Sequence, residues 1–311
     1  MPAAARSTKH AQRLPRFIAP MLATPGKPFD SAEHLFEVKW DGTRGLAFVE
    51  DGACRLVNRR RIDFTDRYPE FGFLSRLPSG TVLDGEVVVL HRGKADFDRL
   101  MAREQLRTPF KIKTSARAMP ATYIVFDVLY ENYTSLMSRP LHERRQRLEA
   151  LVAACRNERL ILSQGVVGDG TAFYDEAVKL GLEGVVAKRL GSQYLPGKRS
   201  LAWVKIKRFE RIFCAIIGFI PDGNDDFRSL VIAAESEQGL RSVGKVGTGF
   251  DARLRARLNK LLWPRVCERP IVACRLRARW VTPGLYCWVT CMERTKGGEL
   301  RAPVFAELCV E

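Results

Sequence analysis

A lysine followed by a carboxylate and a glycine is the first feature of this sequence that could carry chemistry. Lys39 lies in the stretch Phe36-Glu37-Val38-Lys39-Trp40-Asp41-Gly42-Thr43-Arg44. Its apolar residues indicate a strand, and the Asp41-Gly42 pair indicates a turn that ends it. A lysine at a strand end can project its amine into a pocket, and an amine becomes a nucleophile when burial or neighbouring cations lower its pKa. A surface lysine at a hairpin explains this motif alone equally well.

Four further segments place charged residues beside short apolar runs. Glu86 interrupts an aliphatic strand, where a buried carboxylate is costly unless it meets a cation, a metal or a hydroxyl. Lys205 and Lys207 alternate with apolar residues, so they share one strand face. Each segment alone also fits a turn or a solvated strand face. Together they could hold a nucleoside triphosphate, its divalent metal and a nucleic acid phosphate. The segments are Leu83-Asp84-Gly85-Glu86, Glu183–Lys188, Trp203–Lys207 and Asn58-Arg59-Arg60-Arg61.

Strands alternate with helices along the chain up to Arg208, and these elements would position the charged residues. In the predicted helix Pro140–Arg156, apolar residues such as Leu148 occupy one face and the arginines the other. The other predicted helices are Asp66–Leu77, Asp96–Arg107 and Thr171–Leu180. The predicted strands are Gly45–Glu50, Arg55–Asn58, Val82–His91, Tyr123–Leu129, Gly184–Lys188 and Ala202–Ile206.

The pattern changes after Arg208 to five strands interrupted by one helix, Asp251–Leu262. This order suits a small barrel of the OB type. We therefore predict an α+β chain with two domains, residues 1–208 and residues 209–311. The predicted strands of the second domain are Ile212–Ile220, Leu230–Ala234, Leu240–Val246, Leu285–Glu293 and Leu300–Phe305.

The composition favours a nucleic acid partner. The 311 residues carry a formal net charge of +16, which attracts polyanions. No apolar run is long enough to span a bilayer, and the basic segment Met1–Arg16 lacks the apolar core of a secretory signal. Eight cysteines without a C-x-x-C pair, and only four histidines, argue against a zinc site. We expect reduced cysteines in a cytoplasmic protein, with Cys287 and Cys291 at alternate positions of one strand.

The ordered set of motifs resembles the nucleotidyltransferase motifs of ATP-dependent polynucleotide ligases. The resemblance extends from about Pro20 to Phe305 and is strongest to bacterial DNA ligases of the end-joining type. The Lys39 motif alone is shared with RNA ligases and mRNA-capping enzymes. Three other stretches narrow the match to the DNA ligases, namely Phe64–Glu70, Val243–Phe250 and Leu300–Phe305. The implied fold is a nucleotidyltransferase (adenylation) domain of packed antiparallel sheets with flanking helices, followed by an OB-fold β-barrel.

The resemblance also implies a role for each motif residue. Lys39 would attack the α-phosphate of ATP and form a lysyl-AMP, and Asp41 would organise the metal and the later attack by the DNA 3′-hydroxyl. Lys205 and Lys207 would neutralise the α-phosphate, and Phe126 would stack on adenine unless it is an ordinary core aromatic. Glu37, Arg44 and Glu86 would bind the nucleotide, and Glu183 and Glu86 would bind Mg²⁺ or Mn²⁺. Arg59 would bind the 5′-phosphate of the DNA, and Arg60 and Arg61 would also contact the DNA.

The implied activity is sealing of 5′-phosphate/3′-hydroxyl nicks in double-stranded DNA, without sequence preference, during repair. We expect a monomer associated with the bacterial nucleoid, DNA end-joining proteins as partners, and no membrane partner. Two alternatives stay open, an RNA ligase or capping-type nucleotidyltransferase and a weakly self-adenylylating DNA-end-binding scaffold. A further DNA-contacting element is predicted in the basic segment Arg103–Arg117, for which a solvated loop is an equally good interpretation.

Two departures from the family pattern bear on these expectations. Cys309 stands where the family has an arginine in a segment that orients pyrophosphate, so we expect weaker self-adenylylation. Asn58-Arg59-Arg60-Arg61 replaces the usual Ser-Arg-Asn-Gly, so Arg61 stands in place of a glycine and should restrict the turn.

Overall fold

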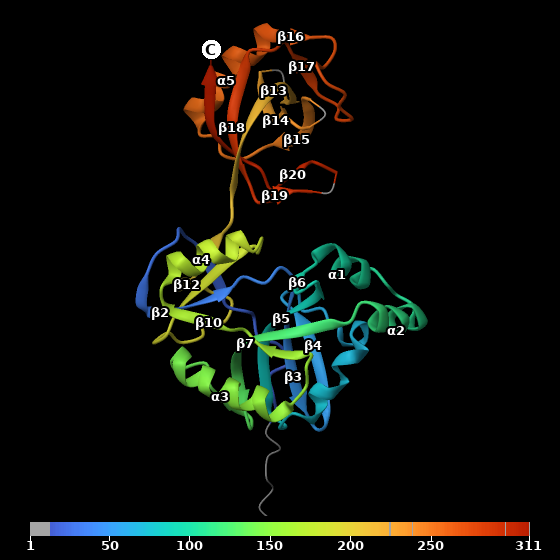
Figure 1. Cartoon of the computed structure of the whole chain (residues 1–311), viewed down its shortest axis with the longest axis vertical. Helices are drawn as coiled ribbons and strands as arrows, with labels where there is room; N and C mark the ends of the chain where they lie inside the picture. The colour runs from blue at the N-terminus through green and yellow to red at the C-terminus, as the bar shows by residue number, and fades with distance from the viewer. Residues whose placement is uncertain (1–12, 224, 238, 296, 311) are drawn as a thin grey trace, which may run out of the picture. The chain divides into compact units, whose positions relative to one another are not determined.

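The computed structural model describes residues 13–223, 225–237, 239–295 and 297–310. The chain divides into two compact units, one ending at Lys207 and the other beginning at Arg208 (Figure 1). Most of the basic segment Met1–Arg16, namely residues 1–12, lies outside the described residues. In the described part of the chain, no helix is long and apolar enough to cross a membrane.

Two sheets pack face to face in the first unit. In β3 (Thr43–Glu50), Ala47 and Val49 enter one apolar core, whereas Leu46 and Phe48 enter another, as the alternation of side chains along a strand requires. The first core lies under the helices, and the second joins the two sheets. The first sheet has the order β4 (Ala53–Asn58), β3, β5 (Thr81–His91), β7 (Ala121–Glu131) and β8 (Thr134–Ser135), with β6 (Lys94–Ala95) on β5 and β9 (Leu160–Leu162) on β7.

The second sheet of this unit brings three distant segments of the sequence together. Strand β11 (Gly184–Arg189) lies between β2 (Ser31–Val38) and β12 (Arg199–Lys207). Because β2 leads into Lys39 and Glu183 immediately precedes β11, this order places the lysine motifs of the sequence side by side. The two edges of the sheet are β1 (Leu22–Pro25) and β10 (Gly165–Gly168).

The helices of the first unit match the sequence prediction in part. α3 (Leu141–Cys155) and α4 (Gly170–Lys179) are confirmed, and α1 (Phe97–Glu104) is shorter than predicted. The predicted helix Asp66–Leu77 is wrong, since the segment forms two 3₁₀ helices, η1 (Thr65–Arg67) and η2 (Pro69–Arg76). Proline disfavours helical backbone in the residue before it, and Tyr68 has φ −129° and ψ 65°. Helix α2 (Pro109–Ala118) occupies the segment for which a solvated loop was the alternative.

Two of the three arginines of α3 are buried and do not lie on an outer face opposite the apolar residues, which corrects the sequence prediction; the third, Arg147, is exposed. Arg144 is completely buried, and its guanidinium donates to both carboxylate oxygens of Asp127, at 2.7 and 2.8 Å. Arg145 is also buried and binds the carboxylate of Glu37. The methylene groups of arginine can line an apolar surface while the guanidinium group pairs with a carboxylate. The presence of arginines in the sequence therefore did not show which face of α3 is exposed.

The second unit is an OB-fold barrel. The strand path runs β15 (Arg241–Val246), β14 (Asp226–Ala234), β13 (Glu210–Asp222), β18 (Leu285–Cys291) and β21 (Val304–Val310). The amide of Phe305 donates to the carbonyl of Thr248 at 2.9 Å and thereby joins the two ends of this path. Gly249 permits this approach, because a Cβ there would lie 2.2 Å from the Phe305 carbonyl oxygen. The smaller elements are α5 (Ala252–Leu262), η3 (Trp263–Arg265), β16 (Val266–Cys267), β17 (Arg279–Val281), β19 (Glu293–Arg294) and β20 (Leu300–Arg301).

Two details of the second unit test the sequence prediction. Cys287 and Cys291 lie in one strand, β18, as predicted, and both are buried in the core. The predicted strand Leu300–Phe305 is wrong as a single element, because Ala302 has a φ of 51° and Pro303 follows it. The left-handed backbone at Ala302 separates β20 from β21.

Candidate active site

Lys39 lies beside a carboxylate and a second lysine. Its amide donates to the Gly184 carbonyl at 2.9 Å, and its ammonium pairs with Oε2 of Glu183. The other oxygen of Glu183 lies 2.9 Å from Nζ of Lys207. Gly184 has a φ of 135°, and a Cβ there would lie 2.1 Å from the Ile206 carbonyl oxygen, so a glycine is needed where β11 meets β12. The sheet thus holds one carboxylate between two lysines.

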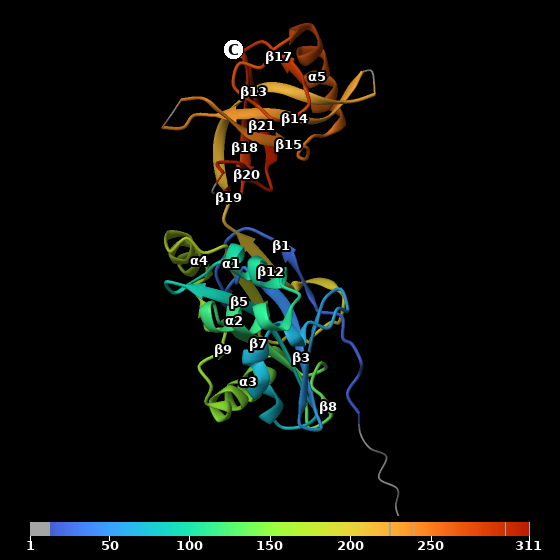
Figure 2. The same cartoon turned by 90° about the vertical axis from the view of Figure 1, so that its right-hand side faces the viewer.

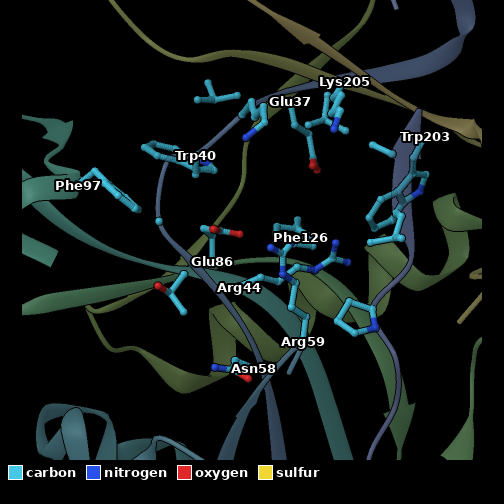
Figure 3. A pocket seen from close by; sticks show the side chains of 18 of the residues that line it. Glu37, Trp40, Arg44, Asn58, Arg59, Glu86, Phe97, Phe126, Trp203 and Lys205 are labelled. Atoms are coloured by element: carbon cyan, nitrogen blue, oxygen red, sulfur yellow. The ribbon is translucent and has the colours of Figure 1, made fainter. Parts of the chain in front are cut away.

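A cavity of about 620 Å³ opens on Lys39, and Figure 3 shows side chains from several strands directed into it. Of the predicted site residues, Asp41, Arg61, Glu183 and Lys207 do not line it, although Glu183 pairs with Lys39 of the cavity and Lys207 pairs with Glu183. The predicted residues that do line it are Glu37, Lys39, Arg44, Arg59, Arg60, Glu86, Phe126 and Lys205.

Lys205 is a lysine of the cavity with a lowered pKa. Burial lowers the pKa of Lys205, and the positive charges of Lys207, Arg199 and Lys39 lower it further. Lys205 and Lys207 project from the same face of β12, as the sequence pattern predicts. The arrangement concentrates positive charge where a phosphate of a bound nucleotide would be neutralised.

Arg44 is held by a bidentate ion pair at the cavity wall. Its Nε and Nη2 lie 2.9 and 2.5 Å from the two carboxylate oxygens of Asp84. The hydroxyl of Tyr194 donates to the same carboxylate at 2.7 Å. Burial alone would lower the pKa of Arg44, but Asp84 and Tyr194 more than offset this effect and raise it. Arg44 is therefore a permanently charged and rigid part of the wall.

Glu86 is a cavity carboxyl whose pKa is shifted into the neutral range. Burial raises its pKa to about 8, while Arg44 and Lys39 oppose the change and Asp84 and Glu183 add to it. The strand register sets Glu86 opposite Arg44 on β3. Near neutral pH this side chain is therefore partly a neutral carboxylic acid that can donate a hydrogen bond.

Phe126 owes its position to a bulge in β7. The pairing with β5 runs from Asp84–Asp127 to Gly85–Val125, so Phe126 is the extra residue without a partner on β5. A bulge of this kind redirects a side chain out of the regular alternation. The Phe126 ring consequently lines the cavity, next to Trp203, whose ring centre is 6.1 Å away. An aromatic face at a cavity wall can stack on a base.

Below Phe126 lies a buried network of charged residues. Nζ of Lys188 is 4.1 Å from the centre of the Phe126 ring and 2.5 Å from the Glu37 carboxylate. The other oxygen of Glu37 lies 2.5 Å from the Arg145 guanidinium. Burial lowers the pKa of Lys188 and raises that of Glu37. Both oxygens of Glu37 are thus engaged by cations, although the residue lines the cavity.

The three arginines at the tip of the basic hairpin, Arg59, Arg60 and Arg61, do not share one environment. Arg59 and Arg60 line the cavity, whereas the Arg61 guanidinium lies 5.1 Å from the centre of the Phe17 ring. Arg61 has a φ of 64°, the conformation that the glycine of the family pattern would adopt without strain. Asn58 compensates, because its Oδ1 accepts from the amides of Arg60 and Ile62 at 2.9 and 3.1 Å.

The comparisons with known proteins agree with this geometry. The model of the ATP dependent DNA ligase domain matches residues 20–207, and that of the ATP dependent DNA ligase C terminal region matches residues 223–309. The chain belongs to the ATP-dependent DNA ligases. The resemblance inferred from the motifs is thereby confirmed.

Relatives of this ligase include proteins of bacterial end joining. The chain is 34% identical over 309 residues to the multifunctional non-homologous end joining protein LigD of Pseudomonas aeruginosa, covering 94% of this chain and 35% of that protein. It is 36% identical over 205 residues to the SPbeta prophage-derived DNA ligase-like protein LigB of Bacillus subtilis, covering 65% and 72%. The chain spans little more than a third of the length of the LigD relatives.

A solved structure supports the same assignment of the ligase. The crystal structure of the ligase domain from Mycobacterium tuberculosis LigD matches with a TM-score of 0.56 and 32% identity, covering 94% of this chain and 95% of that one. A LigE DNA ligase structure shares the fold, with a TM-score of 0.66 at 18% identity. The nucleotidyltransferase fold predicted from the sequence is therefore confirmed.

The sequence reasoning missed several residues of the ligase site. Asp84, Tyr194 and Trp203 fix or flank Arg44 and Phe126, and Lys188 and Arg145 bind Glu37. Lys188 and Asp84 stood within motifs that the sequence analysis selected for their neighbours. Arg145 and Tyr194 carried no local signal, because their roles depend on which segments the fold brings together.

Proposed function

We propose that the ligase seals nicks in double-stranded DNA in three steps, in which Lys39 carries AMP. The amine of Lys39 forms a bond with the α-phosphorus of ATP and pyrophosphate leaves. AMP then passes to the 5′-phosphate of the nick, and finally the 3′-hydroxyl displaces it. The observation that carries this proposal is the position of Lys39 at a cavity that Lys205 and Phe126 also line.

Each wall of the cavity has a proposed task. Phe126 and Trp203 would enclose the adenine, Arg44 and Glu86 would bind the sugar, and Lys205 with Lys207 would neutralise the α-phosphate. In phosphoryl transfer most of the rate enhancement comes from such positioning and neutralisation of charge. Arg59 and Arg60 would bind the 5′-phosphate of the nick, and Arg61 would add long-range attraction. Asp41, which follows Trp40 at the cavity edge, would assist the later attack by the 3′-hydroxyl.

A divalent metal fits this site only as a partner of the nucleotide. No group of three His, Cys, Asp or Glu side chains among the described residues could hold a metal ion alone. Glu86 and Glu183 supply two carboxylates, which suits Mg²⁺ or Mn²⁺ because such ions take their other ligands from substrate phosphates and water. The ion would supply positive charge to the triphosphate.

The biological setting follows from the relatives and is part of the proposal. We propose a role in DNA repair by end joining at the bacterial nucleoid, with the ligase acting as a monomer beside end-joining proteins. DNA would bind through its phosphates and without sequence preference, so affinity should fall steeply with salt.

A paired sealing assay tests the proposed function. Wild-type ligase, ATP and Mg²⁺ should seal a nicked duplex, and the Lys39→Ala variant should not. The variant should still seal a nick that already carries 5′-AMP, because that last step does not use the amine of Lys39. Sealing of RNA nicks only, or no sealing of pre-adenylylated DNA by the wild type, would overturn the proposal.

A further inference from the structure

Helix α2 presents an outward face that the proposed chemistry does not use. Ile112 and Ala116 are buried against the rest of the unit, so the opposite side of the helix faces solvent. Phe110, Thr114 and Arg117 follow one another along this side at helical spacing. Figure 1 shows α2 at the right-hand margin of the first unit, and in Figure 2 it faces the viewer.

Phe110 is the most exposed large hydrophobic side chain of the described chain. It is 80% exposed, although a surface helix normally places such a residue on its buried side. It has no aromatic or cation–π partner within the described residues. Thr114 Oγ1 donates to the Phe110 carbonyl at 3.0 Å, which turns the hydroxyl back to the helix and leaves the ring uncovered.

The charge around Phe110 has one sign. Lys111 and Lys113 flank the outward face, Arg117 lies on it, and α2 contains no acidic residue. Among the ion pairs of the described residues none involves these three cations. This contrasts with α4, where Lys179 is paired with Glu176 of the same helix. Uncompensated positive charge around an apolar side chain is complementary to a phosphate backbone and its sugars.

We propose that this face of α2 binds duplex DNA beside the nick, with Lys113 and Arg117 on phosphates and Phe110 against the sugars of the minor groove. The inference rests on the proposed ligase function, since the bound duplex is the ligation substrate. Helix α1, which residues 105–108 join to α2, lines the catalytic cavity through Phe97, Met101 and Glu104. The α2 face thus belongs to the helix that directly follows a cavity-lining helix in the chain, and the net charge of +16 favours DNA over a protein partner.

The test compares two double variants that each remove two charges from one helix at the same spacing. Lys113→Ala/Arg117→Ala alters α2, and Arg253→Ala/Arg257→Ala alters the exposed side of α5 in the second unit. Binding of a fluorescent nicked duplex is measured by anisotropy between 50 and 200 mM salt, roughly the range over which phosphate contacts are resolved. Self-adenylylation of each variant, which needs no DNA, reports the integrity of the catalytic unit.

The α2 double variant should bind about 10-fold more weakly at low salt, and its plot of log affinity against log salt should be shallower by about 1.8, for two lost phosphate contacts. The α5 variant should change less. Phe110→Ala should weaken binding at every salt concentration without changing the slope, because the lost contact is apolar.

Three outcomes would overturn the inference. Equal losses in the α2 and α5 variants would mean that only net charge matters. If the α2 and Phe110 variants bound DNA as tightly as the wild type, DNA would be excluded as the partner of this face, and an acidic protein segment would be the remaining candidate. A wild type that neither binds the duplex nor takes up AMP would contradict the ligase function itself. If only the α2 proposal were wrong, the wild type would still take up AMP, so the adenylylation measurement separates the two failures.

Discussion

The ammonium of Lys188 lies 4.1 Å from the centre of the Phe126 ring and 2.5 Å from the Glu37 carboxylate, which also binds Arg145. A cation–π contact of this kind fixes the ring more firmly than apolar packing alone. The proposed adenine-binding wall is thus supported from behind by buried charge. Rigid support of this type is what an aromatic wall needs to hold a base in one orientation.

Lys188→Met should destabilise the first unit strongly. The substitution leaves Glu37 buried with one cationic partner, and breaking a buried ion pair typically costs about 3–5 kcal/mol. Urea unfolding would show the loss as a lower midpoint. The double variant Glu37→Leu/Lys188→Met removes both charges, but it also leaves Arg145 with only the more exposed Glu149, at 3.4 Å, as a carboxylate partner. We therefore expect only partial recovery. A stability of Lys188→Met equal to that of the wild type would contradict the network.

Phe126→Ala should weaken ATP binding with little effect on the pre-adenylylated reaction. Stacking of a base on an aromatic side chain contributes about 1–3 kcal/mol, which corresponds to roughly 5- to 150-fold in affinity. The KM for ATP in self-adenylylation measures the effect, and Phe126→Tyr serves as the control that keeps the ring. If the alanine variant had an unchanged KM, Phe126 would be an ordinary core aromatic.

Glu86→Gln should change how the stability of the protein depends on pH. The pKa of Glu86 is about 8 in the folded protein, above the value of 4.5 for an exposed carboxyl. The folded state therefore binds this proton more tightly than the unfolded state does. The stabilisation of the fold by the bound proton is complete below pH 4.5 and is lost as pH rises through 8. Thermal unfolding between pH 5 and 9 should show the variant gaining stability relative to the wild type as pH rises. A constant difference across this range would refute the assignment.

Glu183→Gln should reduce self-adenylylation on the order of 100-fold, the usual effect of losing a charged group that organises a reaction centre. The carboxylate of Glu183 contacts both Lys39 and Lys207, and an amide cannot replace its charge. Glu176→Gln is a matched control, because Glu176 pairs with Lys179 on the exposed side of α4. Equal rates for the Glu183 and Glu176 variants would show that the pair is only structural.

Patterns within single segments made much of the fold predictable. The apolar runs of β3 and β5 and the apolar faces of α3 and α4 lie within single segments, so the sequence displays them directly. The charged residues Lys39, Glu86 and Lys205 were recognisable because a charge beside or within an apolar run is unusual. The resemblance to a family then supplied their roles.

Other parts of the site depend on contacts between distant segments. The bulge that exposes Phe126 results from a change of register between β5 and β7, which the sequence of β7 does not encode alone. The burial of Arg144 and Arg145 depends on carboxylates 17 and 108 residues away. Helix α2 was ambiguous for a simpler reason, since its few apolar residues give a weak periodic pattern.

Intact-mass spectrometry after incubation with ATP and Mg²⁺ tests the central claim most directly. The wild type should gain the mass of one AMP, and peptide mapping should locate it on Lys39. Lys39→Ala should gain nothing, whereas Lys179→Ala, a surface lysine of α4, should be labelled like the wild type. An AMP adduct that persists in Lys39→Ala, or that maps to another lysine, would contradict the account.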